Sequence, residues 1–348
     1  MENKILLKSK KIFSIHLNSN KPENFENFCH ALIDNMDNPD SLEILVHIDT
    51  DDKKMIDVIE KINLSNSNLI SYIESKLIRD FSHAWKPLNL LLERTSPSVE
   101  LIACLSDDLT ISTKGWDSIL LNYICKNESK KIFRIRCSQY KDEIYKNFWE
   151  CGFKPDFSFY SKKWLDIVGY WNPCVGPDTF QETVSFYLNN YGFSNSYIDN
   201  QIHFLGEETL TGLNLYQRIK RAKLGYKTFS ELVSYKNQTK ANFAAYKIAN
   251  ELSEEDIKYN KINFLRHVVI NFYKKINFFH FRGSKSILTS NPIFNLIFII
   301  WCKIDFFDKQ IVELIIYFDK KSILQKIITN KKQYIKLKEA IDKSEYES

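Results

Sequence analysis

The sequence of 348 residues lacks several features that would place it in a specialised class of protein. Its seven cysteines include no CxxC pair, which argues against a disulfide framework or a zinc knuckle and fits a reducing compartment. No apolar run of signal-peptide length occurs near the N-terminus, so we expect a cytoplasmic protein. In the C-terminal third the longest unbroken apolar stretch is LIFIIWC, residues 296–302, whereas a transmembrane helix needs roughly 20 apolar residues. We therefore expect no membrane span there.

The chain also lacks an internal repeat, and it has few glycines and prolines, 9 and 8 respectively. The formal net charge is modest, +5 at pH 7, so the distribution of charge along the chain is more informative than its sum. The length allows one large α/β domain or two smaller ones, with a substantial core.

Short apolar segments alternate with amphipathic segments through the first part of the chain. This alternation predicts a mostly parallel sheet with helices on both faces, which is an α/β fold. We expect strands at residues 12–17, 42–49, 69–74, 99–105 and 131–137, and helices near Pro22 and at residues 53–62, 82–92, 114–125 and 181–191, the last stopped by Gly192.

The pattern changes twice after these elements. Residues 148–180 are rich in aromatic and turn residues, which favours a substrate-facing region over another regular crossover. Beyond about residue 210 the chain changes to helices with basic and aromatic faces. We therefore predict one domain over residues 1–210 and a helical C-terminal region over residues 211–348.

Carboxylates follow two of the expected strands. Asp49, Asp51 and Asp52 come at the end of the strand LEILVHID, and Asp107 and Asp108 come at the end of VELIACL. Ligands of such sheets bind outside the carboxyl ends of the strands, and oxygen ligands suit Mg²⁺ or Mn²⁺. For Asp107 and Asp108 the alternative is a strand followed by a helix cap. For Asp49 and Asp51 it is a solvated loop carboxylate, and Asp52 could cap the helix that begins near residue 53.

The order and spacing of these motifs resemble the nucleotide-binding half of the GT-A glycosyltransferases, especially the family 2 type that uses nucleotide-diphosphate sugars. The resemblance covers roughly residues 10–206 and rests on several segments in order rather than on a single motif. The first strand leads into a Pro-containing loop and a helix in IFSIHLNSNKPENFENF, and the second ends on acids in LVHIDTDD. A helix carrying an Asn precedes the fourth strand in KPLNLLLERTSPSVELIACLSDD, in which SDD looks like the DxD-type element, and TKGWD resembles the turn that follows it.

This resemblance implies metal-dependent transfer of a sugar from a nucleotide-diphosphate donor to a glycan or lipid-linked acceptor. Asp108 would bind Mg²⁺ or Mn²⁺ directly, and Asp107 would face the ribose or hold the metal through water. Asp49 or Asp51 would contact the base. His203, in YIDNQIHFLGEE, falls where many members place a late histidine that completes the metal site.

The resemblance also suggests two cations that would bind the diphosphate and an acid that would act as general base. Arg79 and Lys86, between the third and fourth strands, would reach the diphosphate, or would be ordinary surface cations. An inverting transferase also needs a general base, which the family usually takes from an acidic pair after an aromatic-rich loop. The matching segment is WNPCVGPDTFQETVSFYL, in which Glu182 takes the first place of that pair and Thr183 takes the second. The base therefore stays open between Asp178 and Glu182, which could instead be acids favoured by a helix dipole.

Thr183 also keeps a different class of function open, a catalytically inactive GT-A-like scaffold or binding module. A nucleotidyltransferase on a similar sheet is a further alternative. It should have a glycine-rich basic loop directly after the first strand, and NSNKPENF contains no glycine.

Aromatic and basic residues interleave over residues 262–285 of the C-terminal third. This pattern is typical of a face that contacts an anionic membrane surface, where a lipid-linked acceptor would be found. The alternative is a helical domain that packs its aromatic stripe inward. No recognised RNA-binding module accompanies the stretch, so we expect no nucleic-acid partner. The tail over residues 321–348 could pair subunits, but its heptads are too few to establish an oligomer.

Overall fold

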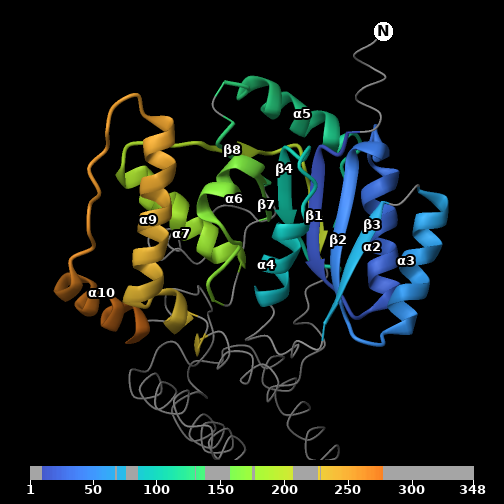
Figure 1. The fold of residues 1–348 in the computed structure, drawn as a ribbon, viewed down its shortest axis with the longest axis horizontal. Helices are drawn as coiled ribbons and strands as arrows, with labels where there is room; N and C mark the ends of the chain where they lie inside the picture. The colour runs from blue at the N-terminus through green and yellow to red at the C-terminus, as the bar shows by residue number, and fades with distance from the viewer. Residues whose placement is uncertain are drawn as a thin grey trace, which may run out of the picture. The chain divides into compact units, whose positions relative to one another are not determined.

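The computed structural model of the protein describes residues 10–66, 69–75, 85–129, 131–137, 157–174, 177–206, 226–227 and 229–276 (Figure 1). The chain divides into two compact units, the first formed by residues 1–207 and 235–262 and the second by residues 208–234 and 263–348. The first unit holds the sheet and most of the described helices.

Seven strands form the central sheet, in the order β3-β2-β1-β4-β7-β6-β8. β7 pairs antiparallel with both β4 and β6, and the other neighbouring strands are parallel. The prediction of a mostly parallel α/β sheet is therefore confirmed. The strands are β1 (Phe13–Asn18), β2 (Leu42–Asp49), β3 (Ile70–Ser75), β4 (Leu101–Cys104), β6 (Arg134–Cys137), β7 (Phe157–Ser161) and β8 (Ser196–Asp199).

Helices cover both faces of this sheet. The chain moves from β1 to β2 to β3 in one direction and then crosses back to β4, so right-handed connections put α2 and α3 on one face and α4 on the other. The packing agrees, since α2 contacts α3 whereas α4 contacts β1 and β2. The helices are α2 (Pro22–Asp34), η1 (Pro39–Ser41), α3 (Lys53–Ser65), α4 (Trp85–Arg94), α5 (Trp116–Lys126), α6 (Lys162–Val168), α7 (Pro177–Asn190), α9 (Tyr235–Leu252) and, in the second unit, α10 (Phe264–Ile276).

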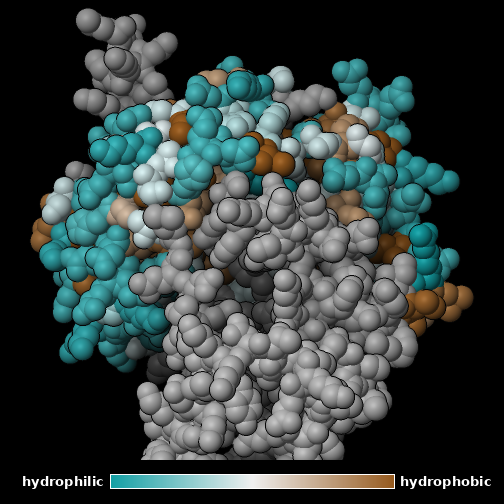
Figure 2. Space-filling view, turned by 180° about the vertical axis from the view of Figure 1, so that it is seen from behind, coloured by the Kyte–Doolittle hydropathy of each residue, from teal (hydrophilic) through white to brown (hydrophobic). Residues whose placement is uncertain are grey.

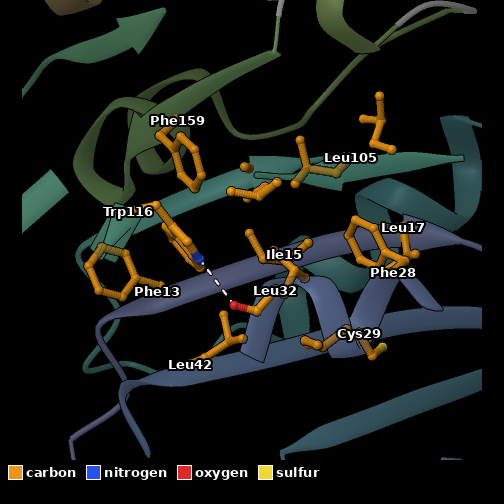
Figure 3. Close-up of a cluster of buried hydrophobic side chains, with 14 of the residues drawn as sticks. Phe13, Ile15, Leu17, Phe28, Cys29, Leu32, Leu42, Leu105, Trp116 and Phe159 are labelled. Carbon is orange, nitrogen blue, oxygen red and sulfur yellow. Dashed lines mark hydrogen bonds between the residues drawn. The ribbon is translucent and has the colours of Figure 1, made fainter. Parts of the chain in front are cut away.

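The core lies between the sheet and the helices on each face. In β1 the apolar side chains of Phe13, Ile15 and Leu17 are buried, and the alternating Ser14 and His16 are buried as well. Such burial on both faces is typical of the central strands of a parallel sheet. Figure 3 shows the cluster formed by the apolar side of this strand with helix α2 and with aromatic residues from later in the chain.

The segment TKGWD has a structural role in this core. The Trp116 indole packs against Phe13, with ring centroids 5.5 Å apart, and its Nε1 donates a hydrogen bond to the Leu32 carbonyl oxygen at 3.1 Å (Figure 3). The buried carboxylate of Asp117 accepts from the backbone N–H groups of Asp37 and Asn38, both at 2.9 Å. The segment therefore fixes the start of α5 onto the turn that follows α2.

The aromatic-rich region differs from our expectation. Residues 157–168 form a regular strand and helix, β7 and α6, rather than an irregular substrate-facing segment. Three of its described aromatic side chains are core residues, since Phe159, Trp164 and Trp171 are all fully buried or nearly so. The presence of these three residues thus reflects packing in the core, and residues 148–156 lie outside the described residues.

Helix α9 belongs to the same unit as the sheet, although it follows residue 210. It packs against α6 and α7, where Tyr187 donates to the Gln238 Oε1 atom at 2.8 Å and Lys247 donates to the Ile167 carbonyl oxygen at 3.0 Å. The domain boundary that we place near residue 210 stays a prediction, but the chain after it returns to the first unit through α9.

The described surface is mainly hydrophilic in the view of Figure 2, with separate hydrophobic patches. Within the part of the chain that the structure describes, no helix combines the length and the apolar composition needed to cross a membrane.

Candidate functional site

The carboxyl ends of β3, β2, β1 and β4 lie along one edge of the sheet, because these four strands are parallel neighbours. β2 ends at Asp49, which pairs with Ser75 at the end of β3. Asp107 and Asp108 follow β4 at the same edge. The fold therefore brings the two acidic groups predicted from the sequence to one side of the molecule.

Ser19 joins these loops at the end of β1. Its backbone N–H donates to the His47 carbonyl oxygen at 3.1 Å, and its hydroxyl donates to Asp107 Oδ2 at 2.6 Å. Ser19 is buried, whereas its partner Asp107 is half-buried. Our sequence reasoning missed Ser19. The only available signal was a small polar residue directly after a buried strand.

The environment of Asp107 disfavours its charged form. Burial raises the pKa of its carboxyl above the usual value, and the neighbouring Asp108 carboxylate raises the pKa further, whereas the Ser19 hydrogen bond and the charge of Lys21 lower it. A turn closed by a hydrogen bond from the Leu109 N–H to the Ser106 carbonyl oxygen, at 3.2 Å, holds the two acids side by side. A bound cation would relieve the repulsion between them.

Of the three acids after β2, one has a structural role and two remain candidates for contact with a nucleotide. Asp52 is the N-cap of α3, and its Oδ1 accepts from the Met55 N–H at 3.2 Å, which confirms the structural alternative for this residue. Asp51 is exposed and has a positive φ of 67°, in the left-handed region that Asp tolerates better than most residues. Asp49 is half-buried at the end of β2. The roles of Asp49 and Asp51 toward a nucleotide stay predictions.

His203 lies away from Asp108. β5 (Leu109–Ile111) and β9 (Phe204–Gly206) pair antiparallel, and His203 sits opposite Ser112, whose N–H donates to the His203 carbonyl oxygen at 3.1 Å. Ser112 is four positions after Asp108, and the strand β5 lies between them, so their backbones are about 13 Å apart at the rise of a strand. This register argues against His203 as a ligand of the metal that Asp108 would bind.

Of the two cations predicted to bind phosphate, Lys86 lies at the start of α4. Lys86 is exposed in the first turn of α4, and its Nζ lies 5.7 Å from the centroid of the Trp85 ring. Because α4 connects β3 to β4, its first turn lies on the side of the sheet edge that carries the acids. Arg79 falls outside the described residues.

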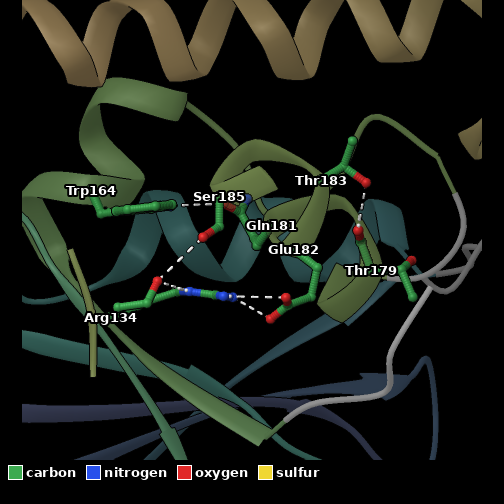
Figure 4. Close-up of polar contacts among 8 residues, drawn as sticks. Arg134, Trp164, Thr179, Gln181, Glu182, Thr183 and Ser185 are labelled. Carbon is green, nitrogen blue, oxygen red and sulfur yellow. Dashed lines mark hydrogen bonds and ion pairs between the residues drawn. The ribbon is translucent and has the colours of Figure 1, made fainter. Parts of the chain in front are cut away.

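Glu182 is held in a buried ion pair. Arg134, on β6, donates to both carboxylate oxygens of Glu182 on α7, through its NH1 and NH2 groups, and its Nε donates to the Ser196 hydroxyl at 2.6 Å (Figure 4). The two charged side chains are only 3% and 4% exposed. A carboxylate whose oxygens are both bonded to an arginine is poorly placed to take a proton from an acceptor, so the structure argues against Glu182 as the general base.

The other positions of that segment are structural or lie at the helix start. Thr183 donates to the Thr179 carbonyl oxygen within α7, at 3.0 Å. Asp178 is the second residue of α7. Since β8 runs parallel to β6 and β4, the preceding helix α7 runs in the opposite direction and begins near the carboxyl edge of the sheet. The fold thus brings the backbone of Asp178 to the same edge as the other acids.

The Asn in α4 has a defined role in joining these parts. Asn89 Oδ1 accepts from the backbone N–H groups of Trp171 and Asn172, at 2.8 and 3.2 Å, and its Nδ2 donates to the Asn172 carbonyl oxygen at 2.8 Å. The Trp171 indole in turn donates to His16 Nδ1 at 2.9 Å, and burial lowers the pKa of His16 to about 3, so this imidazole is neutral. These bonds hold the loop before α7 against β1 and α4.

The donor set at the sheet edge suits a hard divalent cation. Among the described residues, no group of three or more His, Cys, Asp or Glu side chains converges as a metal site. However, Mg²⁺ is usually bound through one or two carboxylates, with phosphate oxygens and water as the remaining ligands. Asp107 and Asp108 provide such a pair.

Comparison with known proteins supports the fold. The chain is similar to the structure of mannosyltransferase PcManGT from Pyrobaculum calidifontis in complex with GDP-Man and Mn²⁺, with 11% identity, a TM-score of 0.52, and coverage of 85% of this chain and 88% of that chain. The strand order and this similarity define a protein with the GT-A fold. No protein-family model and no curated protein matches the sequence.

Two further structures are more distant. S. aureus TarS 1-349 in complex with UDP has 12% identity, a TM-score of 0.44, and coverage of 84% of this chain and 88% of that chain. Glucosyl-3-phosphoglycerate synthase from Mycobacterium tuberculosis, in complex with Mn²⁺, UDP and glucosyl-3-phosphoglycerate, has 13% identity, a TM-score of 0.42, and coverage of 67% and 81%. Similarities of this strength are too weak to support an inference.

Proposed function

We propose that the protein is a glycosyltransferase, which transfers a sugar from a nucleotide-diphosphate donor to a glycan or lipid-linked acceptor with Mg²⁺ or Mn²⁺ as cofactor. The observation that carries this proposal is the Asp107–Asp108 pair at the carboxyl edge of a GT-A sheet, with Asp107 bonded to Ser19. The similar fold of a mannosyltransferase solved with GDP-Man and Mn²⁺ supports it.

The acids at the carboxyl edge of the sheet would contact different parts of the donor and its metal ion. Asp108 would be the direct metal ligand, because Asp107 already accepts the Ser19 hydroxyl through one of its oxygens. Asp107 would bond to the ribose or hold the cation through water, and Asp49 and Asp51 would contact the nucleotide. Lys86 would approach the diphosphate from the first turn of α4, where the helix dipole also favours an anion.

A bound divalent cation would supply positive charge to the diphosphate leaving group as the bond to the sugar breaks. To hold this cation, Asp107 and Asp108 would have to be ionised. Since the pKa of Asp107 is raised, its charged form is reached at higher pH than for an ordinary aspartate. As the pH is lowered, Asp107 should therefore take up its proton, and donor binding should weaken, at a higher pH than for an ordinary aspartate.

Activation of the acceptor would fall to Asp178, because Glu182 is held by Arg134. The first turn of α7 favours a carboxylate, since the backbone N–H groups and the helix dipole there stabilise negative charge. Asp178 would accept the proton of the attacking hydroxyl, and the product would have the opposite anomeric configuration to the donor. Retention of the donor's configuration would contradict this assignment.

The proposal is tested with a panel of nucleotide sugars, each with and without Mn²⁺, by thermal shift and by donor hydrolysis. The wild type is compared with Asp108→Ala and with Asp57→Ala, a matched control at an exposed aspartate of α3. We expect a metal-dependent shift for one nucleotide that is lost in Asp108→Ala and kept in Asp57→Ala. If no donor shifts the wild type, the acids only end a strand and the proposal fails.

A catalytically inactive GT-A-like binding module is the second candidate. The observation in its favour is that neither residue of the expected acidic pair offers a free carboxylate, because Glu182 is paired and Thr183 is a threonine bonded to its own helix. Such a module would give the same metal-dependent shift but no hydrolysis or transfer. Turnover that is lost in Asp178→Asn, with donor binding unchanged, would exclude it.

A further inference from the structure

Helix α10 exposes the apolar side of its first two turns. The exposed fractions are 55% for Phe264, 75% for Leu265, 46% for Val268 and 69% for Val269. At about 100° per residue these positions fall within an arc of about 140°, so they form one continuous face. Large apolar residues gathered on one exposed face are unlike the single ones found on most soluble surfaces, and they mark an interaction site.

Two polar residues of the helix are less exposed than its apolar face, although Arg266 is exposed. His267 and Asn271 lie outside the apolar arc, and both are half-buried, each with a ring or amide atom that water does not reach. A helix packed against its own domain shows the reverse arrangement, with its apolar face inward. The helix start is well defined, since Asn263 Oδ1 accepts from the Arg266 N–H at 3.0 Å. The apolar face of α10 is therefore presented outward by a regular, capped helix.

The sequence around α10 carries charge of a single sign. Between Asp256 and Asp305 there is no acidic residue, whereas this stretch contains eight lysines and arginines. Arg266 is exposed within the helix itself. Cations that flank an apolar helical face attract anionic headgroups, and the combination is typical of helices that lie on a membrane surface.

We propose that this face, formed by Phe264, Leu265, Val268 and Val269, binds the surface of an anionic lipid bilayer. The helix would lie in the plane of the membrane, with the apolar side chains among the acyl chains and the neighbouring cations at the phosphate level. The proposal is independent of the function proposed above, because membrane binding requires neither donor nor metal. It goes further in one respect, since membrane binding would bring the protein to the bilayer in which a lipid-linked acceptor is found.

The test uses the full-length protein and vesicles of phosphatidylcholine alone or of phosphatidylcholine with phosphatidylglycerol, with bound protein measured by flotation. Leu265→Glu/Val269→Glu adds negative charge to the exposed face, and Leu64→Glu is the matched control, because Leu64 is 89% exposed on α3. We expect the wild type and the control to bind the anionic vesicles and the double variant to lose at least about tenfold in affinity. Binding should also weaken when the salt is raised from about 0.1 to about 0.5 M.

Three results would overturn the proposal. The wild type could fail to bind anionic vesicles, or the double variant could bind as well as the control. In the third, light scattering would show that the double substitution dissociates a dimer of the wild type, so that a second copy covers the face. Thermal unfolding of the double variant, and its response to nucleotide sugars, show that the fold and the donor site are intact. A negative membrane result therefore leaves the proposed function untouched.

Discussion

The buried ion pair between Arg134 and Glu182 allows a quantitative prediction that separates a structural role from a catalytic one. Both side chains are almost completely buried, and Arg134 makes two bonds to Glu182 and one to Ser196. Replacing Glu182 by Leu would remove both carboxylate bonds to Arg134 and leave the guanidinium buried without this counter-charge. Breaking a buried pair from one side costs about 3–5 kcal/mol, because an uncompensated charge stays in the interior.

We therefore expect Glu182→Leu and Arg134→Met each to lower the free energy of unfolding by about 3–5 kcal/mol. The double variant Arg134→Met/Glu182→Leu should lose much less than the sum, because apolar residues of similar volume need no partner. Urea unfolding measured by tryptophan fluorescence gives the three values and the coupling between the two sites. A single-variant loss below about 1 kcal/mol, or strictly additive losses, would refute the reasoning.

The same variants distinguish the two roles of Glu182. If Glu182 were the general base, the apolar double variant would lose turnover by about 10²–10⁴-fold even where it is fully folded. If Glu182 only anchors α7 to β6, the folded double variant should keep most of its turnover. The measurement is transfer rate at a temperature at which unfolding curves show both proteins to be native.

Two further predictions concern the edge acids and the turn before α5. The raised pKa of Asp107 means that the folded chain holds this proton more tightly than the unfolded chain, so stability falls as pH rises from the ordinary value of 3.8 through the raised one. Asp107→Asn should therefore unfold at a higher temperature than the wild type at neutral pH, with the difference vanishing below the ordinary value; equal pH dependence would contradict this. Gly115 has a φ of +65°, and a Cβ there would lie 2.9 Å from Asp37 Oδ2, so Gly115→Ala should destabilise by about 1–2 kcal/mol from backbone strain plus a contact penalty. Gly169→Ala is the control, because Gly169 has φ +87° with nothing within 4 Å of its Cβ, and the same loss in both variants would show that the contact is unimportant.

The parallel half of the fold could be predicted from the sequence because its elements are local and strongly patterned. β2 has the bounds that the apolar run LEILVHID predicts, and β1 and β3 differ by a single residue. Burial on both faces gives such strands an uninterrupted apolar signal, and the acids that follow them give clear ends. The crossover rule then gives the hand of the parallel connections, whereas the order of the strands comes from the structure.

The antiparallel part was not predictable in the same way. β7 and α6 lie in a region of aromatic residues whose content we took as a sign of substrate contact, whereas these side chains are buried. Composition does not distinguish an aromatic residue that packs in a core from one that faces a ligand. The partner that decides the case is distant in sequence, as for Trp171, whose indole bonds to His16 across the chain.

The candidate site shows the same limit for charged residues. The sequence shows that Glu182 could act as a base and that His203 could bind a metal. It does not show that Glu182 pairs with an arginine, or which strand register places His203. Arg134 lies 48 positions before Glu182, and only the alignment of β6 beneath α7 reveals that they meet. The resemblance assigns His203 and Asp108 to the same metal site. The antiparallel pairing of β5 with β9 puts His203 at the end of this two-stranded sheet that is farther from Asp108.

Asp107 is the residue for which sequence and structure together favour function over packing. Its carboxylate is half-buried beside a second carboxylate, an arrangement that destabilises the folded chain at neutral pH, as its raised pKa indicates. The hydrogen bonds from Ser19 and from the backbone N–H of Asp107, together with the charge of Lys21, reduce this penalty without removing it. A structural acid in the same protein is treated differently, since Asp117 is fully buried but accepts two backbone N–H groups. An acid that is held in place yet left electrostatically incomplete is what a cation-dependent ligand site requires, because the missing positive charge comes with the ligand.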